Sequence, residues 1–433
     1  SHKLDVDSVL VRATGDTMNK LITIQSNDVV ATIRGDYQLS KLPASVQYYL
    51  SRYIPNYIPA PDKYAPNQNI DFRIETKSID SIFAVTVPII RGFDSSVFSG
   101  SLNTSTKKLT LSAEVPQASV GKFHMYNVSL TGIGDFDRLG LTTTIEDVVL
   151  GDSIVNGSLS LTTTVAHDSV GFTIATTAPD TSSSLTLNGQ IIARKDSLFL
   201  TLYPSQFYLN QAKWDIAGGS HIVYSDKYLL VNGFSISSGF QKITANTELN
   251  NTDKYLLINT ENLDLGQFGN FAGLSAYQPD GRLSGTVKID QLFGDMMISA
   301  NVKATDVKFS NDTLGTVNII GTYDGKKQLI NLDPRTGIFH NNSSVIASGN
   351  ISFDSTTHQK LDGSIEFKNA SVGWASPFLT GIMSHLSGTI NGKLGFKGSS
   401  YEPELDGTVN LLNAGFRLDY MGTNYTIPFA TVT

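Results

Sequence analysis

Apolar residues alternate with small polar residues along most of this 433-residue chain. Leu109, Leu111 and Ala113, for example, are separated by Thr110 and Ser112. Because successive side chains of a β-strand point to opposite faces of a sheet, a period of two predicts strands with one apolar and one polar face. At roughly one strand per 12 residues the chain would form about 35 strands. The sequence therefore predicts a mostly β fold.

A single flat sheet of so many strands is unusual, because the twist of neighbouring strands accumulates and coils the sheet. We expect an elongated, twisted antiparallel sheet that curls into an open groove, with a few short helices. The residues predicted to line this groove are Leu159, Leu161, Val170, Phe172, Ile174, Leu185, Leu187, Leu198, Leu200, Leu202, Val287, Ile289, Val307, Phe309, Leu361, Ile365, Phe367, Leu394, Phe396, Leu405, Val409 and Leu411. Such a lining would bind acyl chains through the apolar area that they withdraw from water, about 0.8 kcal/mol per methylene.

The composition excludes several other functions. Charged residues make up only 16% of the chain and the formal net charge is −7, so the positive field that attracts nucleic acids is missing. There is no cysteine, which excludes disulfides, cysteine-ligated zinc and a thiolate nucleophile. No run of roughly 20 apolar residues that would form a membrane-spanning helix occurs in this sequence.

No motif of an enzyme, a metal site or a cofactor site stands out. The seven histidines are scattered and never fall at metal-ligand spacing. Asp5-Val6-Asp7 and Asp135-Phe136-Asp137 do not continue into a calcium-binding loop, so we interpret them as turns at strand ends. Nucleophile elbows, phosphate loops and dinucleotide fingerprints are also missing. We therefore expect neither enzymatic activity nor a cofactor.

Three segments depart from the strand rhythm. The helical spacing of apolar residues behind Pro43 predicts a helix over Leu42 to Tyr53, followed by a Pro-rich linker. Shorter apolar segments, 265–274 and 375–385, are candidates for helices that lie over the groove.

Four Asn-Gly or Asp-Gly pairs suit tight hairpin turns, although the last two pairs lie inside alternating patterns, where glycine can instead mark a bend or bulge. They are Asn188-Gly189, Asp324-Gly325, Asp362-Gly363 and Asn391-Gly392.

An internal repeat of roughly a hundred residues lies in the C-terminal part. Leu283-Ser284-Gly285-Thr286 returns as Leu386-Ser387-Gly388-Thr389, and 302–309 with a following Leu314-Gly315-Thr316 returns as 409–416 with Met421-Gly422-Thr423. We read the Gly-Thr steps that end each unit, Gly315-Thr316 and Gly422-Thr423, as turns. The expected regions are 1–66 with strands, a helix and a linker, 67–262 with a continuous groove, and 263–433 with two repeat units, 263–372 and 373–433.

The last fifty residues resemble a known family. A pair of glycine-spaced strands precedes Pro403-Glu404-Leu405-Asp406-Gly407, an Asn413-Ala414-Gly415-Phe416 strand and a Gly422-Thr423-Asn424-Tyr425 turn. Present together and in this order, these steps resemble the C-terminal domain of the TamB family, which belongs with the AsmA-like bridge proteins. A weaker echo begins at Leu263, and the first half of the chain resembles the family only in its strand rhythm.

The resemblance implies a β-taco protein of the periplasm whose parent is anchored in the bacterial inner membrane. Family members are linked to phospholipid movement between the membranes and to outer-membrane protein assembly with a barrel partner of the TamA type. We expect a fragment of such a protein, with phospholipid or another acyl-chain lipid as its ligand and with its membrane contacts made by parts outside this sequence.

Two other kinds of β protein would show the same alternation of apolar and polar residues. A structural or adhesive β-solenoid would have a packed interior and no lipid cargo. An outer-membrane barrel would carry aromatic girdles at both strand ends.

Overall fold

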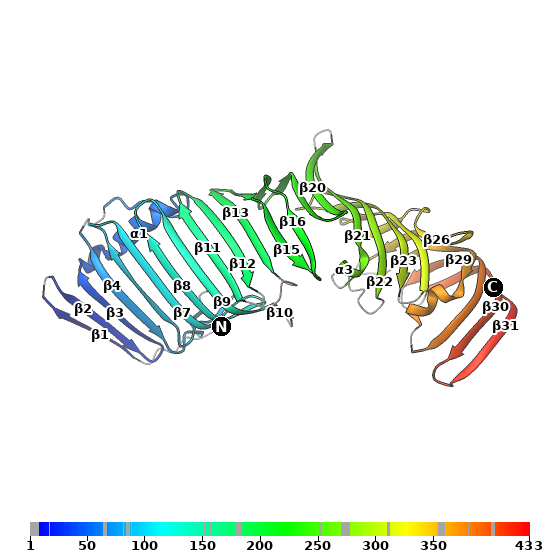
Figure 1. Cartoon of the computed structure of the whole chain (residues 1–433), viewed down its shortest axis with the longest axis horizontal. Coiled ribbons are helices and arrows are strands. Elements are labelled where there is room, and N and C mark those ends of the chain that lie inside the picture. The colour runs from blue at the N-terminus through cyan, green and yellow to red at the C-terminus, as the bar shows by residue number, and fades with distance from the viewer. Residues whose placement is uncertain are drawn as a thin grey trace. The chain divides into compact units, whose positions relative to one another are not determined.

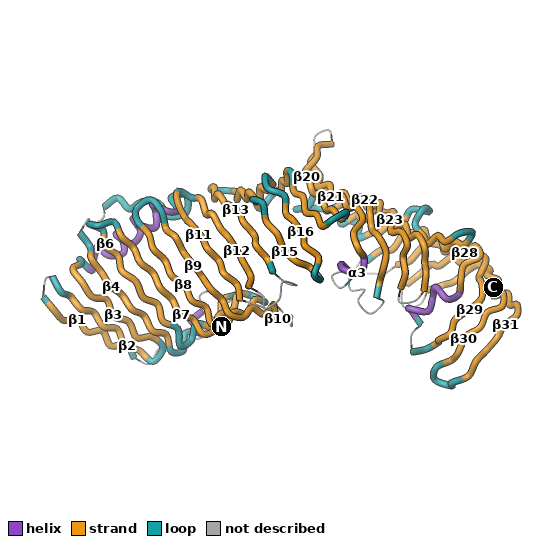
Figure 2. Tube along the Cα trace, in the orientation of Figure 1, coloured by secondary structure: helices purple, strands orange, loops and turns teal. Residues whose placement is uncertain are grey.

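A computed structural model of the chain confirms the mostly β fold, with 71% of residues in strands and 7% in helices. Figure 2 shows how strands dominate the trace. The structure describes residues 8–433 except positions 17, 64–66, 81, 84–86, 88, 151–152, 156–157, 178–183, 251–252, 270–277, 310–311, 354–359, 380 and 400–402. Asp5-Val6-Asp7 thus lies outside the described residues.

The chain divides into two compact units, residues 1–225 and 226–433. The strands of the first unit are β1 (Val9–Gly15), β2 (Lys20–Ser26), β3 (Val29–Asp36), β4 (Asn69–Thr76), β5 (Ile90–Gly92), β6 (Val97–Asn103), β7 (Lys108–Val120), β8 (Phe123–Gly134), β9 (Leu139–Leu150), β10 (Ser153–Val155), β11 (Ser158–Ala166), β12 (Ser169–Thr177), β13 (Leu185–Arg194), β14 (Ser197–Leu202), β15 (Ser205–Leu209), β16 (Ala212–Ile216) and β17 (Ser220–Ser225). Figure 1 shows them following one another in nearly chain order.

The pairings within the first unit are antiparallel and join strands that are close in sequence. The ladder runs from β1 through β2, β3, β4 and β6 to β7, β8, β9, β11, β12 and β13. At three places among the described strands one long strand pairs with two shorter ones: β7 with β5 and β6, β9 with β10 and β11, and β13 with β14 and β15. The meander thus continues across a broken strand without losing its register.

The second unit is an antiparallel meander of the same kind. Its strands are β18 (Tyr228–Asn232), β19 (Phe234–Ser238), β20 (Gln241–Asn250), β21 (Asp253–Asp264), β22 (Pro279–Asp290), β23 (Met297–Phe309), β24 (Asp312–Asp324), β25 (Leu329–Leu332), β26 (Gly337–His340), β27 (Ser343–Ser352), β28 (Lys360–Ser371), β29 (Met383–Ser399), β30 (Pro403–Leu418) and β31 (Thr423–Val432). From β19 to β24 and from β27 to β31 each strand pairs with the next. Between β24 and β27 the short strands β25 and β26 together fill the place of one strand, and each of them pairs with both neighbours.

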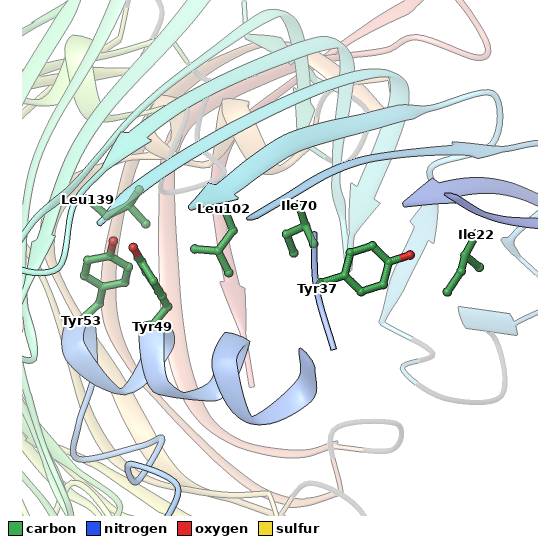
Figure 3. Close-up of a cluster of buried hydrophobic side chains, with 7 residues drawn as sticks. All are labelled: Ile22, Tyr37, Tyr49, Tyr53, Ile70, Leu102 and Leu139. Atoms are coloured by element: carbon green, nitrogen blue, oxygen red, sulfur yellow. The ribbon is translucent and has the colours of Figure 1, made fainter. Parts of the chain in front are cut away.

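The predicted helix is confirmed as α1 (Leu42–Tyr53), which follows the 3-10 turn η1 (Leu39–Lys41) and has proline in its first turn. Tyr49 and Tyr53, each 2% exposed, point from α1 onto the first sheet (Figure 3). Tyr49 donates a hydrogen bond to the Asn103 carbonyl at 3.3 Å, and Tyr53 donates one to the Asp135 carbonyl. The cluster Ile22, Tyr37, Tyr49, Tyr53, Ile70, Leu102 and Leu139 forms the buried core of this unit.

The two other expected helices are shorter than the sequence suggested. The first is α3 (Leu265–Phe268), and 270–274 of its predicted range lie outside the described residues. In place of a helix over 375–385 the structure has the 3-10 helix η4 (Val372–Phe378). Helix η4 contains a proline, and the chain reaches Gly381 in a left-handed conformation (φ +82°), which a continuing helix does not allow. None of the helices in the described part of the chain is long and apolar enough to cross a membrane.

Helix η4 rests on the second sheet through Trp374. Its indole N–H donates a hydrogen bond to the Thr313 carbonyl at 3.1 Å, and the ring packs against a small buried cluster. That cluster consists of Ala304, Val307 and Leu314, flanked by Leu265, Leu283, Phe309, Val317, Ile338 and Trp374. A short helix thus covers one end of the strands in the second unit.

Irregular steps interrupt the long strands of the second unit. Residues with left-handed backbones sit inside β21, β23, β28, β29 and β30, and the strand register shifts beside most of them. They are Asn262, Asp306, Asn369, His385 and Asn413. In four cases the next residue is buried: Leu263, Val307, Ala370 and Ala414. Such β-bulges bend a strand and increase its twist.

Several glycines predicted to form turns lie inside strands instead. Asp324-Gly325 does stand at the turn after β24, where the Gly325 N–H donates a hydrogen bond to Met296. Asn188-Gly189, however, lies within β13. Asp362-Gly363 and Asn391-Gly392 lie within β28 and β29, in agreement with the alternative that the sequence left open for these two pairs.

Gly315, the glycine of a predicted Gly-Thr turn, likewise lies inside β24. Its φ is +85°, and an added Cβ would come within 2.6 Å of the Phe339 carbonyl oxygen, so the residue lets the strand bend beside its neighbour. Its repeat counterpart Gly422 lies at the β30–β31 turn, as expected. The three expected regions of the sequence remain a prediction.

Candidate functional site

In the first unit, paired residues on one face of the sheet form continuous rows across the strands. Row A consists of Ile70, Leu102, Leu109, Gly134, Leu139, Val165, Val170, Ile191, Leu200 and Ile222. Row B consists of Ala13, Ile22, Ile33, Phe72, Gly100, Leu111, Gly132, Leu141, Thr163, Phe172, Gly189, Leu202 and Ser220. Row C consists of Val11, Ile24, Ala31, Ile74, Phe98, Ala113, Leu130, Thr143, Leu161, Ile174 and Leu187. None of the three rows contains a charged side chain.

The opposite face of the same strands is polar. Between rows B and C, on that face, lie Thr32, Arg73, Ser99, Ser112, Thr131, Thr142, Thr162, Thr173 and Asn188. Thr173 and Asn188 are joined by a hydrogen bond of 2.9 Å between their side chains. The sheet therefore separates an apolar face from a hydroxyl-rich face, as the alternation predicted.

Glycines allow the large residues of row B to lie flat on the sheet. A Cβ added at Gly189 would meet the Phe172 ring at 2.6 Å, and one at Gly100 would meet the Phe72 ring at 2.9 Å. The same relation links Gly363 with Phe396 in the second unit, at 2.7 Å. This is the physical reason why Asn188-Gly189 does not form a turn: its glycine makes room for the aromatic ring of the neighbouring strand.

The second unit presents the same arrangement. Row D consists of Leu256, Ile289, Ile298, Tyr323, Ile330, Ile351, Leu361 and Gly398. Row E consists of Phe234, Ala245, Ile258, Val287, Ala300, Gly321, Leu332, Gly349, Gly363, Phe396 and Leu405. Row F consists of Leu263, Leu283, Ala304, Val317, Ile338, Val345, Phe367, Gly392, Val409 and Val432. Rows D to F also lack charged side chains.

All the predicted lining residues lie on these two apolar faces. Most are members of rows A to F. The others stand two residues from a row member on the same strand, which is the same face, or follow the bulge of β23 and contact row F. These others are Leu159, Leu185, Leu198, Ile365, Leu394, Leu411, Val307 and Phe309.

The sequence prediction missed part of the first face. Ile70, Phe72 and Ile74 contribute to rows A, B and C but were not among the predicted lining residues. The signal was present, since these three residues alternate with Asp71 and Arg73 in the same way as the later strands.

Most members of the rows are partly exposed rather than buried. Val409 of row F is buried at 5% exposure, whereas Leu405 of row E is 68% exposed. These exposures agree with sheets whose apolar faces are incompletely covered.

No catalytic or metal-binding constellation emerges in the part of the chain that the structure describes. Groups of three or more potential metal ligands do not occur among those residues. Asp135, expected at a strand end, indeed stands in the turn between β8 and β9. Its carboxylate accepts hydrogen bonds from the backbone N–H groups of Asp137 and Arg138, which lower its pKa.

Comparisons with family models, curated proteins and solved structures found no match to this chain.

Proposed function

We propose that the two apolar faces conduct lipids, with the acyl chains lying on the exposed stretches of rows A to F, outside the parts that α1, α3 and η4 cover, and the headgroups in water. One observation carries this proposal: in each unit, uncharged apolar residues continue from strand to strand on one face and stay partly exposed. An exposed apolar surface of this extent is typical of a site that binds an apolar partner.

The dimensions suit an acyl chain. Neighbouring strands lie ~4.8 Å apart, and one acyl chain spans roughly 15 Å, half the ~30 Å hydrocarbon thickness of a bilayer. One chain would therefore lie across about four strands of a row. Each methylene withdrawn from water contributes about 0.8 kcal/mol, and a shift by one strand exchanges similar contacts. Such a surface holds a lipid but allows it to slide.

The bulges and the glycines support an open groove rather than a flat sheet. Left-handed residues such as Asn369 and Asn413 bend long strands in the second unit.

The resemblance of the last fifty residues to the TamB family supports a proposal for the cellular location and the partner. We propose a fragment of a periplasmic bridge protein that is anchored in the inner membrane and supports outer-membrane biogenesis, with a barrel of the TamA type as partner.

Lipid binding is tested by two measurements on the whole chain. Native mass spectrometry after gentle purification should find phospholipid bound to the protein. A photo-crosslinking amino acid in place of Leu394, on the apolar face of β29, should capture that lipid. In place of the adjacent Lys393, which points to the other face, it should not.

A structural β-solenoid is the outcome if these measurements fail. Absence of co-purified lipid, together with equal crosslinking at positions 393 and 394, would contradict the lipid proposal. The apolar rows would then be explained as the incompletely packed interior of a scaffold.

A further inference from the structure

A cleft of about 340 Å³ lies where row D begins, at the strand ends of the second unit. Leu256 and Ile289, the first two members of row D, form part of its wall. Lys227, Lys254 and Phe293 line it as well, and Phe293 is 44% exposed. The cleft is thus continuous with the apolar face but adds charged groups to it.

Lys254 points to the apolar face of β21. It stands two residues before Leu256 on the same strand, and residues two apart share a face. Lys254 is exposed, and within the described residues no carboxylate forms an ion pair with it. It therefore places a cation at the rim of an otherwise uncharged surface.

The opposite face of the same strands provides a contrast. There Lys288 pairs with Asp290 at 3.1 Å and lies 4.2 Å from the centre of the Tyr255 ring. That lysine is neutralised by its own neighbours. Lys254 on the apolar face has the same charge without such a pairing, so it can serve a ligand.

The lining of the cleft combines two lysine ammonium groups, no carboxylate and several apolar side chains. A ligand that complements it has an anionic head next to an apolar tail. We propose that this cleft holds the anionic headgroup of a phospholipid whose acyl chain extends along row D. This inference rests on the proposed lipid function and adds to it a preference for anionic lipids.

The test compares two acyl-labelled fluorescent lipids with identical chains, phosphatidylglycerol and phosphatidylcholine, titrated against the whole chain. Phosphatidylglycerol should bind more tightly, and added salt should weaken that preference. Lys254→Gln should lower its affinity about fivefold and leave phosphatidylcholine unaffected. Lys254→Arg, which keeps the charge, should preserve the preference.

Lys303→Gln is the matched control, because Lys303 is exposed on the polar face of β23. Equal affinities for the two lipids, or equal effects of the two glutamine variants, would overturn this inference alone. Failure of both lipids to bind would overturn the proposed function itself. Displacement of phosphatidylglycerol by millimolar inorganic phosphate would identify a phosphate site and also contradict the lipid assignment.

Discussion

The two units carry the same kind of apolar face but protect it differently. In the first unit α1 docks two tyrosines onto the sheet. Among the described residues other than glycine, Asn127 of β8 is the one with a left-handed backbone inside a strand of this unit. In the second unit the helices over the sheet, among the described residues, are the short α3 and η4, while bulges recur in β21, β23, β28, β29 and β30.

This difference shows two ways to stabilise one long sheet. The first unit gains a local hydrophobic core from a helix, with large side chains such as Tyr49 and Tyr53 at its centre. The second unit bends its own strands and buries small residues after the bend, such as Ala370 at 0% and Ala414 at 3% exposure. Unit 1 should therefore be sensitive to truncation of aromatic residues, and unit 2 to changes in backbone conformation.

The largest expected effect is on the helix-covered unit. Tyr49→Ala removes a buried ring from the core and should cost about 3 kcal/mol of stability. Peptide-resolved hydrogen exchange should become faster in β4 to β9, whereas the exchange rates in β27 to β31 should stay unchanged. Tyr57→Ala, at a residue that is 54% exposed, is the control and should change neither region. If amide protection were lost in both units, the two units would not be stabilised independently, which would contradict this comparison.

Next comes the fit of Phe172 over Gly189. Gly189→Ala should cost about 1–3 kcal/mol, because the new methyl group would meet the ring. Gly171→Ala is the matched control, because the atom nearest to a Cβ added at Gly171 is the Thr164 carbonyl oxygen, 4.0 Å away. Urea denaturation of the two variants measures the difference. Replacing Phe172 by Leu should recover part of the loss, and equal costs at both glycines would refute the packing argument.

A smaller effect is expected at the bulges of the second unit. Asn413 has a φ of +48°, so Asn413→Ala should destabilise by about 1 kcal/mol, whereas Asn413→Gly should be nearly neutral. The midpoint of denaturant unfolding reports both changes. Asn424→Ala, at an ordinary strand position in β31, is the control. If alanine were tolerated as well as glycine, the bend would not depend on this residue.

The last prediction concerns the pH dependence of stability in the first unit, and it leaves the stability at neutral pH unchanged. Burial, with the nearby carboxylates of Asp135 and Asp137, raises the pKa of Tyr53 to about 12. Because an unfolded tyrosine titrates near ~10, this contribution to stability is complete below pH 10 and is lost as the pH rises towards 12. Thermal unfolding between pH 8 and 12 measures it. Tyr53→Phe should flatten the decline, and an unchanged slope would speak against the assignment.

Much of this architecture could be predicted from residues alone. The period of two placed all the chosen lining residues on the apolar faces, because strand alternation leaves no other choice once the strands are set. The bounds of α1 also followed from Pro43 and the helical spacing of its apolar residues.

The remaining features depend on neighbours that are distant in sequence. Asn188-Gly189 looks like a turn until the strand that carries Phe172 is placed beside it. The bulges at Asn369 and Asn413 have no periodic signature, because asparagine occurs equally in turns. The cleft at Lys254 was likewise missed, since it is built by strand ends that only the register brings together.

Lipid access to the apolar face is measured most directly by a single fluorophore, which the absence of native cysteines makes straightforward. Cysteine introduced at Leu161 or at the adjacent Thr162 places the dye on the apolar or the polar face of β11. Phospholipid with brominated acyl chains should quench the dye at position 161 and leave position 162 unaffected. Equal quenching at the two positions, or none at position 161, would contradict the view that this face holds lipid.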